Sequence, residues 1–149
     1  GVENIARVRL DCEKYAMPLM IEPLVRQPNS ERGGYLVDGD AEKIVTLVRL
    51  AREMGADIIK ADPTSDPRDF HRVIQAARCP VLVRGGGKAD LRQVFANSYE
   101  LMKQGAQGMV YGRNIYQHDA PGRVVTALMA LIHDGPSRTE AWRLYEAAA

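Results

Sequence analysis

The sequence lacks the features that mark several classes of protein. No apolar stretch approaches the roughly 20 residues of a membrane-spanning helix, so we expect no membrane partner. The first residues lack the uninterrupted apolar core of a signal peptide. The absence of a disulfide framework fits a reducing cytoplasm, where we expect the protein. With a formal net charge of +1 and no basic block, the chain does not indicate nucleic acid as a partner.

Patterns typical of metal sites and disulfide frameworks are also missing. The two cysteines, Cys12 and Cys79, are far apart, and we predict that they are buried free thiols. The three histidines, His71, His118 and His133, are scattered and form no ligand motif. The sequence therefore predicts neither a metal nor a cofactor.

Short apolar segments alternate with segments of helical periodicity along the 149 residues. The apolar segments predict strands at 17–24, 57–62, 79–84 and 108–112. A helix is expected before the first strand, and further helices at 40–54, 66–77, 90–104, 121–132 and from 137 onward. This alternation predicts an α/β fold in which helices cover a parallel sheet.

Two folds fit four strand-helix units. They make half of an eight-stranded TIM barrel, which typically needs about 250 residues, or an open doubly wound sheet. In the barrel interpretation the edge strands of this half would expose unpaired backbone groups. We then expect a preceding half of about 100 residues or more.

Polar residues gather where the predicted strands end, which is where ligands bind in both folds. Glu22 lies near the end of the first strand, and Lys60 and Asp62 lie at the end of the second. Around the ends of the third and fourth strands are two further groups: Arg84, Gly85, Gly86, Gly87 and Lys88, and Gly112, Arg113 and Asn114. Glycine lets the backbone come close to a ligand, and the cations can contact an anion. The two glycine-basic turns predict a phosphate site; the alternative is that the glycines only make a mobile turn.

Lys60 ends an apolar strand, although lysine is rarely buried without a partner. In a strand, Ile58, Lys60 and Asp62 point to one face. Burial and nearby positive groups disfavour the ammonium form of a lysine, and a neutral amine can form a Schiff base with a carbonyl. A structural lysine paired with Asp62 is the other interpretation, and the segment alone leaves both open.

The segments "GADIIKADP", "LVRGGGK" and "YGRNIYQH" resemble the Schiff-base (class I) aldolases of the archaeal-type fructose-bisphosphate aldolase and deoxyribose-phosphate aldolase superfamily. The chain is most similar to a bacterial branch of these enzymes. The resemblance implies an eight-stranded barrel, with residues 1–149 as the C-terminal half of a single domain that supplies strands five to eight. It also implies that Lys60 is the Schiff-base lysine.

The resemblance assigns further roles. The family's phosphate-binding turn falls on Gly85 and Gly86 with a basic position at Lys88, and its "GRN" motif falls on Gly112, Arg113 and Asn114. Two positions depart from the family pattern. Glu22 stands where fructose-bisphosphate aldolases carry a tyrosine that handles protons. The candidates for that task are therefore Glu22 and a residue of the preceding half, where the family also has an acidic residue. Arg84 replaces a small residue, and this added cation suggests a more acidic substrate.

We therefore expect a lyase of carbohydrate metabolism that breaks or forms a carbon–carbon bond in a phosphorylated ketose or keto-acid sugar, and that forms a homo-oligomer. The expected catalytic residues are Lys60, Glu22 and Asp62; the phosphate-binding residues are Gly85, Gly86, Gly87, Lys88, Gly112 and Arg113; and the substrate-binding residues are Arg84 and Asn114. The alternatives are thiolase-like acyl transfer on a phosphorylated diketone and a catalytically incomplete half-barrel that binds phosphate.

Overall fold

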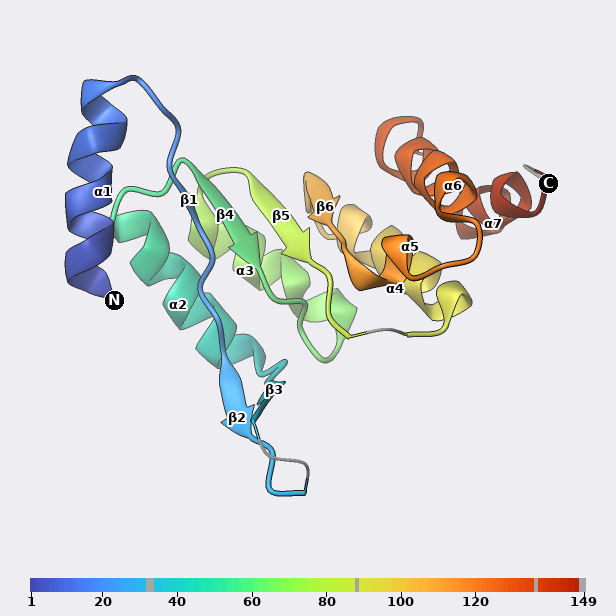
Figure 1. Ribbon diagram of the computed structural model, residues 1–149, viewed down its shortest axis with the longest axis horizontal. Helices are drawn as coiled ribbons and strands as arrows, with labels where there is room; N and C mark the ends of the chain where they lie inside the picture. Colours follow the sequence, from blue (N-terminus) through green and yellow to red (C-terminus); the bar gives the residue numbers. More distant parts are fainter. Residues whose placement is uncertain (32–33, 88, 136, 148–149) are drawn as a thin grey trace.

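Four parallel strands form the central sheet of the computed structural model, which describes residues 1–31, 34–87, 89–135 and 137–147 (Figure 1). The strands are β1 (Met20–Ile21), β4 (Ile58–Ala61), β5 (Val81–Arg84) and β6 (Gly108–Val110). They are arranged in the order β1-β4-β5-β6, and each neighbouring pair is parallel. The parallel pairing of all four strands confirms the predicted α/β fold with a parallel sheet. The order of the strands in the sheet also follows their order in the chain.

Helices occupy the segments between and around these strands. They are α1 (Val2–Lys14), α2 (Ala41–Glu53), the 3₁₀ turn η1 (Pro67–Asp69), α3 (Phe70–Ala77), α4 (Leu91–Lys103), α5 (Arg113–Tyr116), α6 (Pro121–His133) and α7 (Arg138–Ala147). All the predicted helices are present. The four-residue helix α5 was not predicted, because one turn is too short to show helical periodicity.

Local sequence determines where α2 begins and ends. The carboxylate of Asp40 accepts hydrogen bonds from the backbone N–H groups of Glu42 and Lys43, which have no partner within the helix. After the helix, Gly55 adopts φ of +92°, a left-handed conformation that glycine takes without a steric penalty. Both residues stand at the ends of the helix predicted at 40–54. They set the start of β4 and hence the position of Lys60 at its end.

The two faces of the sheet are buried to different extents. Ile59, Ala61, Val81 and Val83 are buried in a core that includes residues of α2, α3 and α4. The alternate residues of β4 and β5, among them Lys60, are only partly buried. Within the described residues, helices thus cover one face. A doubly wound sheet has helices on both faces, so the structure does not support that alternative.

The face opposite the helices carries apolar side chains that water can reach. Met20 is paired with Ile58 across the ladder and is 44% exposed, and Val110 at the other edge is 37% exposed. Val110 pairs with Arg84, which places both on the same face. An exposed apolar sheet face of this kind is typical of a surface that packs against further protein.

An antiparallel hairpin was not predicted. It consists of β2 (Arg26–Pro28) and β3 (Tyr35–Val37), and Figure 1 shows it extending away from the sheet. All six strand residues are exposed, so no burial pattern could have revealed it. The first predicted strand was also too long: only Met20–Ile21 of residues 17–24 pairs with a neighbour.

Cys12 and Cys79 are free thiols, as predicted, but they are partly buried rather than buried. Cys12 lies on α1, a helix with no fully buried residue, and Cys79 lies in the connection before β5. Among the described helices, none is both long and apolar enough to cross a membrane. The described residues contain no group of three His, Cys, Asp or Glu side chains that could hold a metal ion.

Candidate active site

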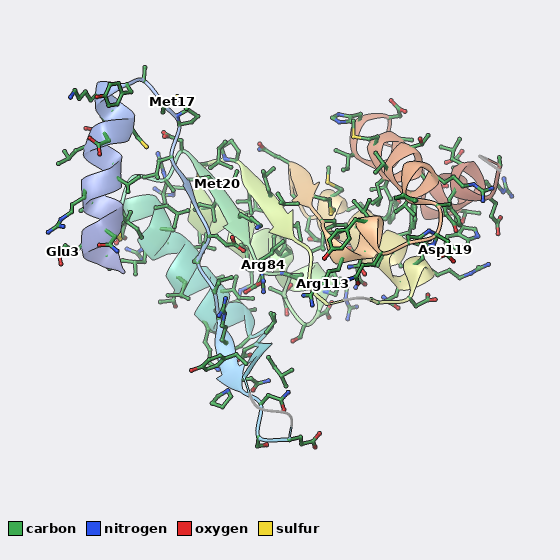
Figure 2. The ribbon with its side chains drawn as sticks, viewed as in Figure 1. Glu3, Met17, Met20, Arg84, Arg113 and Asp119 are labelled. Atoms are coloured by element: carbon green, nitrogen blue, oxygen red, sulfur yellow. The ribbon has the colours of Figure 1, made fainter. Side chains whose placement is uncertain are left out.

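Side chains from three strands meet at the carboxyl end of the sheet. Glu22 follows β1, Lys60 lies near the end of β4, and Arg84 is the last residue of β5. Figure 2 shows Arg84 and Arg113 near each other at this end of the sheet. The parallel order of the strands brings these residues together, although they are far apart in the sequence.

Lys60 is paired with Glu22. Its Nζ lies 3.1 Å from Oε2 of Glu22, and the lysine side chain is 21% exposed. The alternating burial of β4 confirms that Lys60 shares a face with Ile58, while Ile59 and Ala61 face the helices. Within the described residues, the carboxylate that contacts Lys60 is that of Glu22 and not that of Asp62. The structure therefore does not show the predicted alternative pairing with Asp62.

Arg84 contacts two carboxylates. Its Nε donates a hydrogen bond to Oδ1 of Asp62 and lies 3.7 Å from Oε1 of Glu22. Asp62 is fully buried, and its Oδ2 has no hydrogen-bond partner among the described residues. Four charged groups thus form one chain of contacts, from Lys60 through Glu22 and Arg84 to Asp62.

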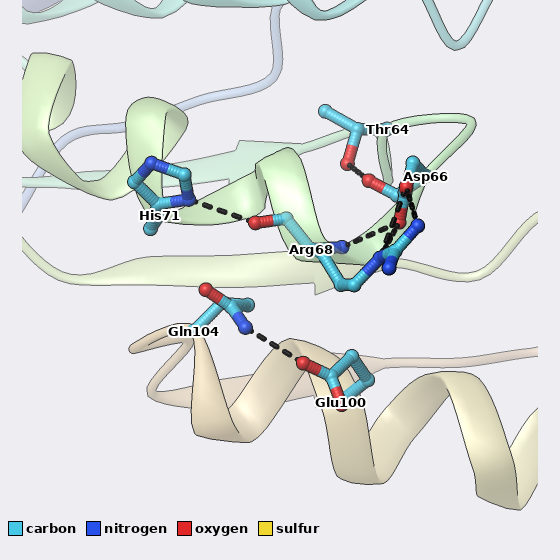
Figure 3. A network of polar contacts seen from close by, with 6 residues as sticks. All are labelled: Thr64, Asp66, Arg68, His71, Glu100 and Gln104. Carbon is cyan, nitrogen blue, oxygen red and sulfur yellow. Dashed lines mark hydrogen bonds and ion pairs between the residues drawn. The ribbon is translucent and has the colours of Figure 1, made fainter.

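The loop that follows Asp62 is held by its own polar contacts (Figure 3). The hydroxyl of Thr64 donates to the backbone oxygen of Asp66, 2.7 Å away. The carboxylate of Asp66 accepts from the backbone and the guanidinium of Arg68. The hydrogen bond from the Arg68 side chain lowers the pKa of Asp66 to about 2, so this carboxylate stays ionised at neutral pH.

The glycine loop after β5 is held by α5. Nη2 of Arg113 donates to the backbone oxygen of Gly86 at 3.2 Å, and Nδ2 of Asn114 donates to that of Gly87 at 3.1 Å. Oδ1 of Asn114 accepts from the N–H of Ala89 at 2.9 Å. The two predicted turns are therefore adjacent, with Gly112 as the residue before α5. Lys88 lies outside the described residues.

Packing explains one of the three glycines. A Cβ at Gly85 would lie 2.9 Å from the ring of Tyr111, so this position needs glycine. A Cβ at Gly86 or Gly87 would meet nothing within 4 Å, and neither residue has the positive φ that favours glycine. Neither packing nor backbone conformation within the described residues accounts for Gly86 and Gly87. Close approach of a ligand to the backbone would account for both.

The glycine loop lines a cavity of about 250 Å³. Its lining includes Arg84, Tyr111 and Asn97 on α4, of which sequence reasoning missed the last two. The hydroxyl of Tyr111 lies 2.9 Å from that of the fully buried Ser98. Burial raises the pKa of Tyr111, and the Ser98 contact opposes this rise. The sequence did not indicate that Tyr111 lines a cavity, because a tyrosine in an apolar segment such as "GMVYG" is common in ordinary strands.

The chain matches known aldolases over most of its length. The family model described as DeoC/LacD family aldolase matches residues 1–118. An uncharacterized aldolase from Saccharolobus solfataricus is 33% identical over 94% of this chain and 50% of its own length. The class 1 fructose-bisphosphate aldolase of Thermoproteus tenax is 33% identical over 93% of this chain and 51% of its own length. The chain therefore spans about half the length of these relatives.

Some relatives are named for other activities. The 3-hydroxy-5-phosphonooxypentane-2,4-dione thiolase of Photorhabdus laumondii is 28% identical over 97% of this chain and 46% of its own length.

Solved structures similar to this chain are also aldolases. A crystal structure of an archaeal fructose 1,6-bisphosphate aldolase has a TM-score of 0.79 at 30% identity, covering 90% of this chain and 52% of the other. A structure of the Schiff-base-forming fructose-1,6-bisphosphate aldolase has a TM-score of 0.78 at 30% identity, covering 89% of this chain and 52% of the other.

Proposed function

The chain belongs to the DeoC/LacD family of aldolases, and from this premise we propose that it is part of a class I aldolase acting on a phosphorylated ketose or keto-acid sugar. Lys60 forms a Schiff base with the substrate carbonyl. The observation that carries this proposal is the contact of 3.1 Å between the Lys60 amine and the Glu22 carboxylate at the carboxyl end of the sheet. An amine and a proton acceptor in contact are what imine chemistry requires.

Residues 1–149 form the C-terminal half of a (β/α)₈ barrel in this proposal and supply its strands five to eight. Two observations support it: the four strands follow chain order, and the sheet face opposite the helices exposes Met20 and Val110. The chain also spans about half of its relatives. A preceding half would cover that face and pair with the edge strands β1 and β6.

Imine formation uses Lys60 and Glu22 together. Glu22 takes a proton from the ammonium group, and the neutral nitrogen then bonds to the carbonyl carbon. The electron pair of the C=O bond moves to the oxygen, which receives a proton from the nitrogen. The resulting hydroxyl takes the proton held by Glu22 and leaves as water, so that a protonated imine remains and Glu22 is again ionised.

The protonated imine withdraws electrons from the neighbouring carbon. Glu22 removes the proton from the substrate hydroxyl one carbon further along, the C–C bond breaks, and its electron pair moves toward the imine nitrogen to give an enamine. An aldehyde is released. The enamine carbon then takes the proton back from Glu22, and water hydrolyses the imine to return the Lys60 amine and a ketone. No metal is required at any step.

Phosphate binding is assigned to the glycine loop and to α5. Support comes from Gly86 and Gly87, whose glycine identity no contact within the described residues requires, and from the guanidinium of Arg113 beside Gly86. Backbone N–H groups and an arginine are common partners of phosphate. Lys88 adds a positive charge in this proposal. The short helix α5 positions Arg113 and Asn114 against the loop.

Arg113→Ala is expected to weaken binding of phosphorylated substrates. A hydrogen bond between charged groups is worth about 1.5–3 kcal/mol, and about 1.4 kcal/mol corresponds to a factor of ten. The Michaelis constant should therefore rise about tenfold or more in steady-state assays, while an unphosphorylated analogue should show little change. Arg92→Ala, on α4 outside this loop, is the matched control. An unchanged Michaelis constant in Arg113→Ala would place the phosphate elsewhere.

The proposed activity is tested by incubating the complete enzyme with phosphorylated ketoses and keto-acid sugars and measuring aldehyde release. Cleavage should continue in the presence of a metal chelator, because the lysine supplies the electron sink. The relative named as a thiolase favours a second candidate, acyl transfer in the same site. That reaction needs a thiol acceptor, so activity that appears only when coenzyme A is added would favour the second candidate.

A further inference from the structure

Glu22 lies between two cations. Its Oε2 is 3.1 Å from Nζ of Lys60, and its Oε1 is 3.7 Å from Nε of Arg84. Each carboxylate oxygen therefore faces a different positive group. We propose that Arg84, anchored by Asp62, is a positioning residue that holds Glu22 against Lys60. This inference rests on the proposed roles of Lys60 and Glu22 in imine chemistry.

The anchor of Arg84 is buried and charged. Asp62 is fully buried, and the donor that reaches its carboxylate within the described residues is Nε of Arg84. A buried carboxylate is stable only when it is paired, so this contact commits both side chains to one geometry. The Arg84 side chain itself is only 18% exposed. Its planar guanidinium consequently presents a fixed edge toward Glu22.

The same contacts argue against an anion-binding role for Arg84. Asp62 and Glu22 already match the charges of Arg84 and Lys60, two negative groups against two positive ones. A further anion near Arg84 would meet a neutralised group and repulsion from both carboxylates. Arg84 was expected from the sequence to bind an acidic substrate; the geometry instead favours a role exerted through Glu22.

Glu22 needs such support because of where it lies. It follows β1, a strand with only two paired residues, and its side chain is 36% exposed. A glutamate in this position would otherwise sample several rotamers. A misplacement of about 1 Å in a reacting group can cost on the order of 10² in rate. Holding Glu22 at hydrogen-bonding distance from the amine should therefore affect turnover more than substrate binding.

The test is a double-mutant cycle in the complete enzyme. Arg84→Gln is expected to lower kcat by about tenfold or more with little change in the Michaelis constant, because the group that moves is the proton carrier. In a Glu22→Gln background, Arg84→Gln should have almost no further effect, since the residue through which it acts is already gone. Arg49→Gln, which breaks the exposed pair with Glu53, is the control that should retain parental kinetics.

Each of the following outcomes would overturn the inference. A rise of tenfold or more in the Michaelis constant at unchanged kcat would make Arg84 a substrate-binding residue. Additive effects of Arg84→Gln and Glu22→Gln would show that Arg84 does not act through Glu22. If the parent enzyme forms no imine on Lys60, the proposed function fails; if it does and Arg84→Gln behaves like the parent, this inference alone fails.

Arg84→Gln could also lower activity because the buried carboxylate of Asp62 loses its partner. A second variant distinguishes this effect from misplacement of Glu22. Arg84→Gln leaves Asp62 without its cation, whereas Arg84→Gln combined with Asp62→Asn removes both charges. The double variant should fold, as judged by circular dichroism, and should keep the low kcat of Arg84→Gln. Recovery of parental kcat in the double variant would show that the loss came from Asp62 and would overturn the positioning role.

Discussion

Lys60→Arg is expected to abolish turnover and leave the fold intact. A guanidinium remains protonated at any accessible pH and cannot attack a carbonyl, whereas its charge can still pair with Glu22. Loss of a catalytic nucleophile lowers rates by roughly 10⁴ or more. We expect a loss of this size in aldehyde release, with unchanged circular dichroism and an unchanged melting temperature.

Lys43→Arg is the matched control for this experiment. Lys43 also pairs with a carboxylate, that of Asp38 at 2.6 Å, but it lies at the start of α2 and not at a strand end. The control should keep parental activity. Substantial activity in Lys60→Arg would show that no neutral amine at this position takes part in the reaction.

Glu22→Gln is expected to lower turnover by about 10² to 10⁴, the usual contribution of general acid–base catalysis. Glutamine keeps the size of the side chain and can still accept a hydrogen bond from Lys60, but it cannot carry the proton. Imine formation and C–C cleavage should both slow, because Glu22 is proposed to act in each. Rapid-quench measurement of each step distinguishes this result from a defect in binding.

The control for Glu22→Gln is Glu53→Gln, which removes an exposed carboxylate paired with Arg49 at 2.9 Å. Exposed pairs of this type contribute little to stability, so parental behaviour is expected. Turnover within a factor of two or so of the parent in Glu22→Gln would remove this residue from the mechanism, given the magnitudes above.

The alternation of apolar residues was enough to predict the face of the sheet on which Lys60 lies. The buried row of β4, Ile59 and Ala61, is apolar, so alternation alone placed Lys60 on the opposite face. The ends of the helix predicted at 40–54 also depend on adjacent residues, Asp40 before it and Gly55 after it. These features depend on neighbours along the chain, and local patterns therefore reveal them.

The contacts within the site could not be predicted in the same way. Whether Glu22 points toward Lys60 depends on the pairing of β1 with β4, which joins residues 38 positions apart. The contact of Arg84 with Asp62 likewise depends on the register between β4 and β5. A single strand pattern carries no information on register between strands, so the sequence left Asp62 as a possible partner of Lys60 and Arg84 as a free cation.

Reductive trapping of the imine tests directly whether Lys60 forms a Schiff base. The complete enzyme is incubated with dihydroxyacetone phosphate, other ketose phosphates and phosphorylated keto-acid sugars in the presence of borohydride, and the protein is then analysed by intact mass and peptide mapping. We expect the mass of one reduced adduct, located on Lys60 and absent from Lys60→Arg. An adduct on Lys88 or another lysine, or turnover of a substrate that leaves no adduct, would contradict it.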